Sequence, residues 1–454
     1  MVIRPLLLLG ALVLPVVLAC ATDSCASAFT ASAAAAITFC ETYTTATVTA
    51  TTSLPPFATA CSNSSKKLSS ACTCLLGTAA SGTVATTTCT ATAYAQITSA
   101  VASCTDIVLE NISAPVSSTI DLTGLRAGST VTFAGTTFKT FGTTEDSDFN
   151  PIEIGGTAIT ITGAPGHVID GNGQAYWDGQ GSNGGSSKSV ISLLGDRQGT
   201  IKLIRIARPD HFIVLNKMVA GTIKDLSIQN WPVHCFDITK CNVMTLSGLT
   251  LNNSAGDAVN SISQGLPAAH NSDGFDISST TNLVLADSTV INQDDCVAVT
   301  SGTNITVTGM TCSGGHGLSI GSVGGKSDNT VAGVTFSDST ISNSQNGCRI
   351  KTNSGTTGNI TNIVYEDITL SNISIYGIDV QQDYLNGGPT GDPTNGVIID
   401  GVTFTNVVGT ALPNATDYYV LCGSGSCSGI TFTDVNITGG GVGSSCNFPS
   451  TGCP

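Results

Sequence analysis

The sequence predicts an all-β protein, a right-handed parallel β-helix with a small cysteine-rich extension at its N-terminus. Two repeating patterns support this prediction. The first is a short segment in which one apolar residue lies between small or polar neighbours, and it occurs five times between residues 270 and 380. The copies are 22, 21, 32 and 28 residues apart, which fits one coil of a solenoid with loops of variable length. Their central residues are Phe275, Val297, Leu318, Ile350 and Ile378.

The second pattern is a short run in which an apolar residue follows Ser, Thr or Asn, again once per coil. Most copies are followed within two residues by Asn, which tolerates the left-handed backbone of a tight bend and can bond to its copy one coil away. Because one coil cannot bury its own apolar face, stacking of the coils supplies the core. The runs end at Ile228, Leu251, Val290, Cys312, Ile341, Leu370, Phe404 and Ile437.

A β-sandwich is the alternative architecture. Sandwich strands recur about every 8 to 12 residues and are joined by hairpin turns. Here the repeating unit spans about twenty residues or more, which favours the β-helix. Equivalent residues of successive coils then lie about 4.8 Å apart, the usual separation of strands.

Residues 1–21 are predicted to be a secretory signal peptide. Arg4 precedes an apolar run that ends in the small residues Ala19-Cys20-Ala21, and prolines interrupt it. No later stretch approaches the length of apolar sequence that a membrane span needs. Of the 17 cysteines, the 16 beyond Cys20 suit an oxidising compartment, and eight Asn-x-Ser/Thr sequons agree with export. We therefore expect a secreted, extracellular protein without a membrane anchor.

Composition divides the remaining chain in two. Residues 22–88 are rich in Ala and Thr, hold five cysteines and lack the later periodicity, so we expect a disulfide-linked appendage or propeptide there. Residues 89–454 carry the strand pattern and form the expected catalytic β-helix. Only 10% of residues are charged and the net charge is -15, which argues against binding to nucleic acid.

The alternation of a strand predicts which side chains share a surface. The central apolar residue points inward, so Arg349 and Lys351, which flank Ile350, project from the same exterior face. Such a cation pair either forms salt bridges with neighbouring carboxylates or binds an anionic substrate. Asp273 and Asp295 hold equivalent positions on successive coils, and two carboxylates that close raise the pKa of one of them.

Asp294 and His316 complete the candidate site. Asp294 lies one residue off the line of Asp273 and Asp295, so the three provide the protonated acid and ionised base that glycoside hydrolysis requires. A calcium site or a strand-end turn is the alternative explanation of this acidic pair. His316 lies one coil further along and between glycines, where a bulky sugar could reach its imidazole.

Four segments, in this order, resemble the signature segments of the polygalacturonases, which are inverting glycoside hydrolases that cleave pectin. The resemblance extends from about Cys89 to the C-terminus and is closest to fungal endo-acting members; Ser272 stands where the family usually has Thr, and the hydroxyl is kept. The segments are Asn271-Ser272-Asp273, Asp294-Asp295, Gly315-His316-Gly317 and Arg349-Ile350-Lys351.

The resemblance implies a role for each candidate residue. Asp294 would be the general acid, kept protonated with the help of His316, while Asp273 and Asp295 would hold and deprotonate the attacking water. Inverting enzymes generally separate acid and base by about 6.5 to 9.5 Å, and an approach near 5 Å would favour retention. The residues implied to bind the substrate are Asn271, Arg349, Lys351 and Tyr376.

The resemblance also implies four disulfides and no metal or cofactor. The pairs are Cys89–Cys104, Cys296–Cys312, Cys422–Cys427 and Cys446–Cys453. Cys235, Cys241 and Cys348 have no partner in this scheme. The expected partner is polygalacturonate or pectin, bound by a monomer, with inhibitor proteins of the host cell wall as further candidate partners.

Other functions remain open on the same fold. An exo-polygalacturonase and a rhamnogalacturonan hydrolase are the nearest alternatives, and the Arg349/Lys351 pair favours a polymer with a carboxylate on every residue. A pectate lyase would need carboxylates that bind calcium and a basic group that abstracts a proton. A non-catalytic β-helix that binds pectin would have no need of a paired acid and base.

Overall fold

The computed structural model describes residues 39–40, 55–61, 67–68, 71–72, 87–139, 149–184, 189–190, 204–205, 209–385 and 388–454. The chain forms two compact units, residues 1–83 and 84–454. In the described part of the first unit, 3-10 helix η1 (Pro56–Cys61) and the disulfide Cys40–Cys72 are present. The predicted signal peptide lies outside the described residues, and none of the described helices is long and apolar enough to cross a membrane.

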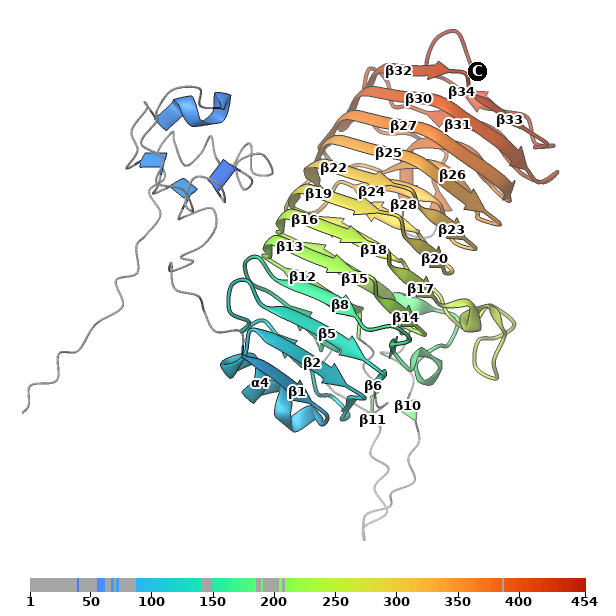
Figure 1. The fold of residues 1–454 in the computed structure, drawn as a ribbon. Helices are drawn as coiled ribbons and strands as arrows, with labels where there is room; N and C mark the ends of the chain where they lie inside the picture. Colours follow the sequence, from blue (N-terminus) through green and yellow to red (C-terminus); the bar gives the residue numbers. More distant parts are fainter. Residues whose placement is uncertain are drawn as a thin grey trace, which may run out of the picture. The chain divides into compact units, whose positions relative to one another are not determined.

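The second unit is a stack of parallel strands in which each coil lies on the previous one (Figure 1). Within the described residues its larger sheet has 20 strands. They are β1 (Thr88–Ala91), β2 (Asp106–Glu110), β3 (Ser113–Ala114), β5 (Thr130–Ala134), β6 (Thr136–Lys139), β8 (Thr160–Gly163), β9 (Val168–Asp170), β13 (Val219–Lys224), β14 (Ser227–Gln229), β16 (Asn242–Ser247), β17 (Thr250–Asn252), β19 (Thr280–Ala286), β20 (Thr289–Ile291), β22 (Gly302–Thr308), β23 (Thr311–Ser313), β25 (Thr330–Ser342), β27 (Gly358–Ile373), β30 (Val397–Ala411), β32 (Cys427–Thr433) and β33 (Asn436–Thr438).

The second sheet has 12 strands among the described residues. They are β4 (Ile120–Leu122), β7 (Ile152–Ile154), β12 (His211–Asn216), β15 (His234–Thr239), β18 (Phe275–Ser278), β21 (Val297–Val299), β24 (Leu318–Val323), β26 (Asn346–Asn353), β28 (Tyr376–Leu385), β29 (Gly388–Pro389), β31 (Thr416–Leu421) and β34 (Ser445–Cys446). The pair β10 (Ser189–Val190) and β11 (Ile204–Arg205) stands apart. The short helices are η2 (Tyr94–Gln96), α4 (Ile97–Ser103), η3 (Gly173–Ala175), η4 (Gly181–Asn183) and η5 (Ser254–Asp257).

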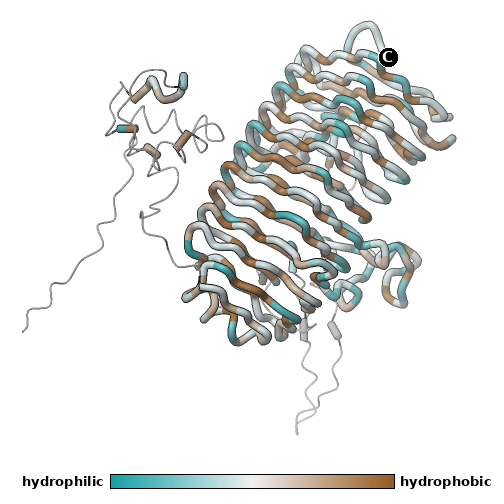
Figure 2. The backbone as a smooth tube through the Cα atoms, in the orientation of Figure 1, coloured by the Kyte–Doolittle hydropathy of each residue, from teal (hydrophilic) through white to brown (hydrophobic). Residues whose placement is uncertain are grey.

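The predicted parallel β-helix is therefore confirmed. The larger sheet consists of two columns that merge where β25, β27 and β30 run long enough to belong to both. Helix α4 packs its apolar residues against the first strands and closes the N-terminal end of the core. Brown apolar positions recur along every coil in Figure 2, as expected when stacking buries one side chain in two.

Asn residues make many of the bends, as predicted. Asn230, Asn343, Asn372 and Asn406 all have a positive φ near 50°, and the Asn372 amide donates to Asn343 Oδ1 one coil away at 3.2 Å. Asn292 has a different role. Its buried amide nitrogen lies 2.9 to 3.0 Å from three carbonyl oxygens, those of Ser272, Asp294 and Asp295.

Two predicted alignments are wrong. Leu318 pairs with Cys348, not with Ile350, and Cys348 pairs with Ile378. Because the error is two residues and side chains alternate with period two, every inward residue still points inward. Phe404 belongs to the other column, and Leu370 pairs instead with Gly409, where an added Cβ would collide with the Leu370 carbonyl. An apolar match could not reveal a position where only glycine fits.

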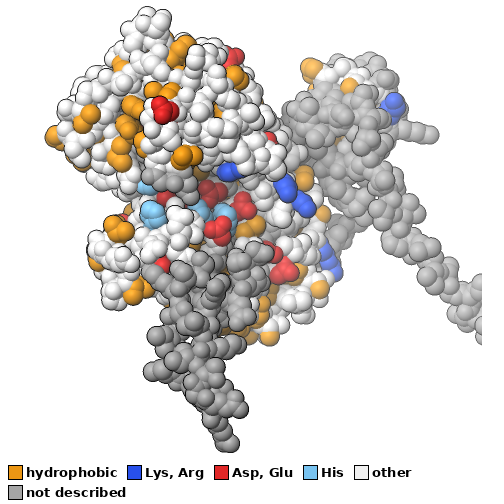
Figure 3. All heavy atoms as spheres, turned by 180° about the vertical axis from the view of Figure 1, so that it is seen from behind, with side chains coloured by type: hydrophobic (Ala, Val, Ile, Leu, Met, Phe, Trp, Pro, Cys, Tyr) orange, Lys and Arg blue, Asp and Glu red, His pale blue; other side chains and the backbone are white. Residues whose placement is uncertain are grey.

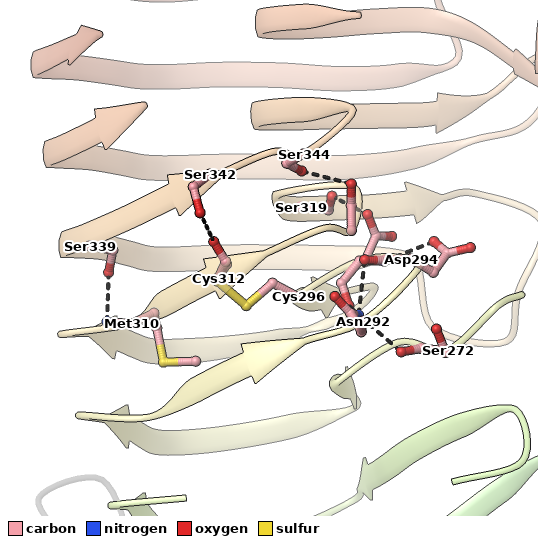
Figure 4. Close-up of a disulfide and its surroundings, with 12 residues drawn as sticks. Ser272, Asn292, Asp294, Cys296, Met310, Cys312, Ser319, Ser339, Ser342 and Ser344 are labelled. Carbon is pink, nitrogen blue, oxygen red and sulfur yellow. Dashed lines mark hydrogen bonds between the residues drawn. A yellow bond between two sulfur atoms is a disulfide. The ribbon is translucent and has the colours of Figure 1, made fainter. Parts of the chain in front are cut away.

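All four implied disulfides of the β-helix are present, and the three cysteines without a partner in that scheme are free and buried. Cys296–Cys312 joins the start of β21 to β23 beside the acidic residues (Figure 4). Because β21, β22 and β23 follow one another within a single coil, this bond joins two parts of that same coil next to Asp294. The coil that carries Asp294 and Asp295 is thus closed covalently, while hydrogen bonds join it to its neighbours.

Aromatic rings stack along the core. Phe236 and Phe275 stack at 5.3 Å, and a second stack runs through Phe336, Tyr365, Phe404 and Phe432 with centroids 4.8 to 5.2 Å apart. Tyr365 is fully buried, and its hydroxyl lies 2.9 Å from the carbonyl oxygen of Arg349 and 3.2 Å from that of Leu318. A side chain of the core thus forms a hydrogen bond with the backbone of Arg349, one of the two predicted cations.

Tyr365→Phe should lower the free energy of unfolding by about 1 to 2 kcal/mol, because buried carbonyls lose a donor that water cannot replace. Urea denaturation would measure the loss. Tyr94→Phe is the matched control, since the Tyr94 hydroxyl also donates to a carbonyl, that of Thr119, but at a partly exposed position. Equal losses in both variants would show that the buried bond has no special weight.

Candidate active site

The structure brings all eight predicted site residues to one cavity of about 660 Å³. They come from loops and strands of five successive coils, and Figure 3 shows the hollow in which acidic, basic and histidine side chains gather. The register of the second sheet explains the convergence, because Phe275, Val297 and Leu318 pair in sequence and place the residues two positions before them in one row. The eight are Asn271, Asp273, Asp294, Asp295, His316, Arg349, Lys351 and Tyr376.

Asp294 and His316 form a close pair. His316 Nδ1 lies 2.8 Å from Asp294 Oδ1, which also accepts the backbone N–H of Asp295 at 2.8 Å. Burial alone would raise the pKa of Asp294, but the charge and hydrogen bond of His316, together with Lys351, hold that pKa below its usual range. Burial lowers the pKa of His316, but the charge and hydrogen bond of Asp294 raise it by more, so the pKa of His316 lies above its ordinary value. In the free site the proton of this pair therefore lies on His316.

A glycine permits this arrangement. The His316 N–H donates to the Asp294 carbonyl at 2.8 Å, which brings two turns of backbone into contact. At Gly315 an added Cβ would collide with that same carbonyl. The glycine pattern in the sequence thus reflects close packing of one coil on the next.

Asp295 is held by a cation and a hydroxyl. Its Oδ2 lies 2.7 Å from Lys351 Nζ, and its Oδ1 accepts from the Ser319 hydroxyl at 2.7 Å. The side chains of Asp295 and Lys351 are 2% and 9% exposed, so water screens this pair little. In the free site Lys351 therefore forms a salt bridge, one of the two roles that the sequence allowed for the cation pair. A substrate carboxylate in the cavity would have to compete with Asp295 for Lys351.

Asp273 differs electrostatically from the other two aspartates. Burial, reinforced by the negative charges of Asp294 and Asp276, raises the pKa of Asp273 to about 7, although His234 opposes the rise. Its Oδ1 lies 3.0 Å from His234 Nδ1. Below neutral pH this carboxyl is therefore protonated in the free site.

The nearest oxygens of Asp294 and Asp295 are close together. One oxygen of each lies within 4.8 Å of the other, whereas inverting enzymes generally hold their two carboxyl groups about 6.5 to 9.5 Å apart. The two residues are adjacent in the chain, and the cations His316 and Lys351 compensate their charges at short range. Carboxylate spacing therefore does not decide the stereochemistry here.

The remaining predicted residues lie at the rim of the cavity. The Asn271 amide donates to Asp294 Oδ2 at 3.2 Å, and its oxygen accepts from the Ser182 hydroxyl at 3.0 Å. Tyr376 stacks on Tyr419 with ring centroids 4.9 Å apart. Asn271 thus orients Asp294, while Tyr376 presents a supported aromatic surface to the cavity.

Sequence reasoning missed several residues of the cavity. Tyr384 at the end of β28 lies beneath the cations, with its ring centroid 5.6 Å from the Arg349 guanidinium and 5.4 Å from Lys351 Nζ. A β-bulge separates it from the repeat, and the pair Gln381-Gln382 interrupts the alternation of β28, so strand periodicity did not indicate Tyr384. His234 and Gln381 also line the cavity.

Arg349 has a buried partner that the sequence did not indicate. Its Nε donates to Asp379 Oδ2 at 3.2 Å, and the Gln381 amide lies 2.9 and 3.0 Å from the two oxygens of that carboxylate. Asp379 is 0% exposed, and burial raises its pKa to about 6 although Arg349 and Gln381 oppose the rise. The protonation of Asp379 and the charge of Arg349 are thus coupled.

Asp379→Asn should make stability less dependent on pH. The unfolded carboxyl releases its proton near its ordinary pKa of 3.8, whereas the native one keeps it up to about pH 6. The native state binds more protons in this window, so the free energy of unfolding falls as pH rises through it. The difference corresponds to roughly 3 kcal/mol, which the variant should not show. Urea denaturation across the window would measure it, with the exposed Asp338→Asn as control; parallel curves for Asp379→Asn and the native protein would refute the effect.

Comparison with known proteins places these observations in a family. Residues 104–453 match the family model of glycosyl hydrolases family 28. The chain is 54% identical to a probable endopolygalacturonase D of Aspergillus oryzae over 95% of both chains, and 61% identical to a polygalacturonase of Fusarium fujikuroi over 74% of this chain and 84% of that one. Endopolygalacturonase I from Stereum purpureum, solved in complex with two galacturonates, superimposes with a TM-score of 0.64 at 30% identity over 78% of this chain and 96% of that one. The chain therefore belongs to glycosyl hydrolases family 28.

Proposed function

We propose that this chain is an endo-polygalacturonase that hydrolyses α-1,4 bonds between unesterified galacturonates within homogalacturonan. The observation that carries the proposal is the convergence of three carboxylates, a histidine and two cations from separate coils on one cavity. The carboxylates supply groups that donate and accept protons, and Arg349 and Lys351 supply charges that suit a substrate carboxylate. Membership of the family and the names of the relatives support the same assignment.

Asp294 would donate a proton to the glycosidic oxygen as the bond breaks. In the free site that proton lies on His316, because the field of Lys351 and His316 holds the pKa of Asp294 low. A galacturonate carboxylate bound to Lys351 and Arg349 would neutralise part of that field. The pKa of Asp294 would then rise, and the proton could pass along the 2.8 Å contact from His316 to Asp294. Substrate binding would thus protonate Asp294 and prepare it to act as the general acid.

Asp295 and Asp273 would hold the water that attacks the anomeric carbon. Asp295 accepts the water's proton, and its two oxygens are already fixed by Lys351 and Ser319. A carboxylate held in this way is better suited to orient water than to attack the sugar itself, which supports single displacement with inversion despite the short spacing. Asp273, protonated below neutral pH, can still hydrogen-bond the same water.

We further propose that the protein is secreted, with residues 22–88 serving as a propeptide or a retained appendage of the β-helix at 89–454. The buried disulfides of both units support an oxidising compartment. Binding to pectin as a monomer, and recognition by inhibitor proteins of a host wall, stay predictions.

Incubation of the purified chain with polygalacturonate tests the function. An endo-acting hydrolase should reduce viscosity strongly when few reducing ends have been released, without products that absorb ultraviolet light. Proton NMR of the first products should show the β-anomer, because inversion converts an α-linkage to a β-hydroxyl. Slow viscosity loss would favour the exo alternative, inertness on polygalacturonate would favour a rhamnogalacturonan hydrolase or a binding module, and an α-anomer would exclude single displacement.

A further inference from the structure

A second cluster of titratable side chains lies at the edge of the cavity. Strands β12 and β15 pair in register, so His211 lies directly beside His234 and their rings stack with centroids 4.9 Å apart. Asp276 on the next strand, β18, reaches both rings: its Oδ2 is 3.1 Å from His234 Nδ1 and 3.4 Å from His211 Nε2. One donor atom of each of the three residues lies within 4.8 Å of the others.

The facing atoms of this cluster lie close together without well-aligned hydrogen bonds. His234 Nδ1, Asp276 Oδ2 and the neighbouring Asp273 Oδ1 are all buried, and among the described residues none has a hydrogen-bond partner of acceptable geometry. Yet His234 Nδ1 lies only 3.0 Å from Asp273 Oδ1 and 3.1 Å from Asp276 Oδ2. Ligands about 2.0 to 2.1 Å from a tetrahedral zinc ion lie roughly 3.3 Å from one another, close to these separations. These separations, and the 3.4 Å between His211 Nε2 and Asp276 Oδ2, are therefore compatible with ligation of one shared ion.

The opposite ring nitrogens have their own carboxylate. Asp210 lies 3.7 Å from His211 Nδ1 and 3.8 Å from His234 Nε2, the nitrogens that point away from Asp276. Histidines that bind a metal usually donate their second N–H to a carboxylate, which fixes the tautomer and ring orientation. Asp210 is 59% exposed and can close these distances by a small movement. One carboxylate could thus serve both imidazoles.

We propose that His211, His234 and Asp276 form a binding site for a divalent transition metal of the zinc class, and that the bound metal inhibits hydrolysis. Two imidazoles with a carboxylate favour zinc over magnesium or calcium, which take oxygen ligands. The two histidine side chains and Asp276 are 18 to 23% exposed, so the site lies near the surface although the facing donor atoms of His234 and Asp276 are themselves buried. The inhibitory part rests on the proposed function, because Asp273 lies against the same nitrogen of His234 and would be drawn toward the metal.

Isothermal titration of the full chain with Zn²⁺ across a pH series tests the site directly. Burial lowers the pKa of His211 and of His234, but their carboxylate neighbours raise both by more, so the ion must displace protons to bind. The native protein should bind one ion at this site, and His211→Ala should weaken that affinity by about 100-fold or more, as loss of a direct ligand exceeds the 10- to 100-fold cost of losing an outer partner. Cobalt should give the visible absorption of a tetrahedral complex in the native protein and lose it in the variant. His270→Ala, at another histidine of the cavity, should leave the affinity unchanged.

The residues of the proposed catalytic site are the strongest alternative location for a bound zinc ion. Asp294, Asp295 and His316 also bring donor atoms within 4.8 Å of one another. If zinc binds there, His316→Ala will remove binding and His211→Ala will not, and the proposal is overturned. Absence of saturable zinc binding overturns it equally.

Hydrolysis assays then test inhibition. Zn²⁺ should slow the native enzyme, a chelator should restore it, and His211→Ala should resist the ion. Since polygalacturonate itself binds divalent cations, the two proteins must be compared on the same short oligogalacturonide. Zinc that binds through His211 without slowing the native enzyme would refute the inhibitory part alone. A chain that binds zinc but hydrolyses nothing would refute the proposed function and leave the site standing.

Discussion

Asp294→Asn is expected to slow the release of reducing ends from polygalacturonate by roughly two to four orders of magnitude, the usual contribution of a general acid. The amide keeps the size of the side chain and can still accept the Asp295 N–H that Asp294 Oδ1 accepts now. The amide cannot take a proton from His316, and it cannot donate a proton to the leaving oxygen. The chemical step should therefore suffer while the fold persists.

Binding separates this result from a structural defect. A short oligogalacturonide should bind Asp294→Asn about as well as the native protein, because Arg349 and Lys351 remain in place. Asp338→Asn is a matched control: Asp338 is exposed, has a positive φ that Asn tolerates, and lies outside the residues that line the cavity. Activity of Asp294→Asn within a few-fold of the native enzyme would assign the acid to another residue.

Lys351→Met should reduce both stability and activity. It leaves the Asp295 carboxylate buried without its cation, and breaking one side of a buried ion pair typically costs about 3 to 5 kcal/mol. It also removes one of the two cations proposed to bind a substrate carboxylate. Urea denaturation and reducing-end assays would measure the two effects, with Lys224→Met as control, because Lys224 is exposed and lies outside the cavity.

A double variant distinguishes the two causes. Lys351→Met with Asp295→Asn contains no uncompensated charge, so it should recover much of the lost stability while remaining inactive. If Lys351→Met unfolds like the native protein, the 2.7 Å contact does not hold Asp295 in solution. Recovery of activity in the double variant would remove both residues from the proposed mechanism.

The candidate site could be predicted from sequence to the extent that it repeats. Asp273, Asp295 and His316 occupy the same position of successive coils, and strand alternation puts Arg349 and Lys351 on one face. The two-residue error at Cys348 did no harm, because it preserves the side of the strand. Residues outside the repeat were missed: Tyr384 follows a bulge, and Asp379 occupies a position where earlier coils have Ser319 and Ala298.

What the sequence by itself determined is the stacking of coils and the row of chemical groups that stacking creates, since both follow from a period in the chain. Only the tertiary structure decided where protons and charges lie. The proton rests on His316, Asp273 titrates near 7, and Lys351 binds Asp295 in the free site. The physical reason is that burial and pairs of charges at about 3 Å control these properties, and such distances arise between residues from different coils that no local pattern records.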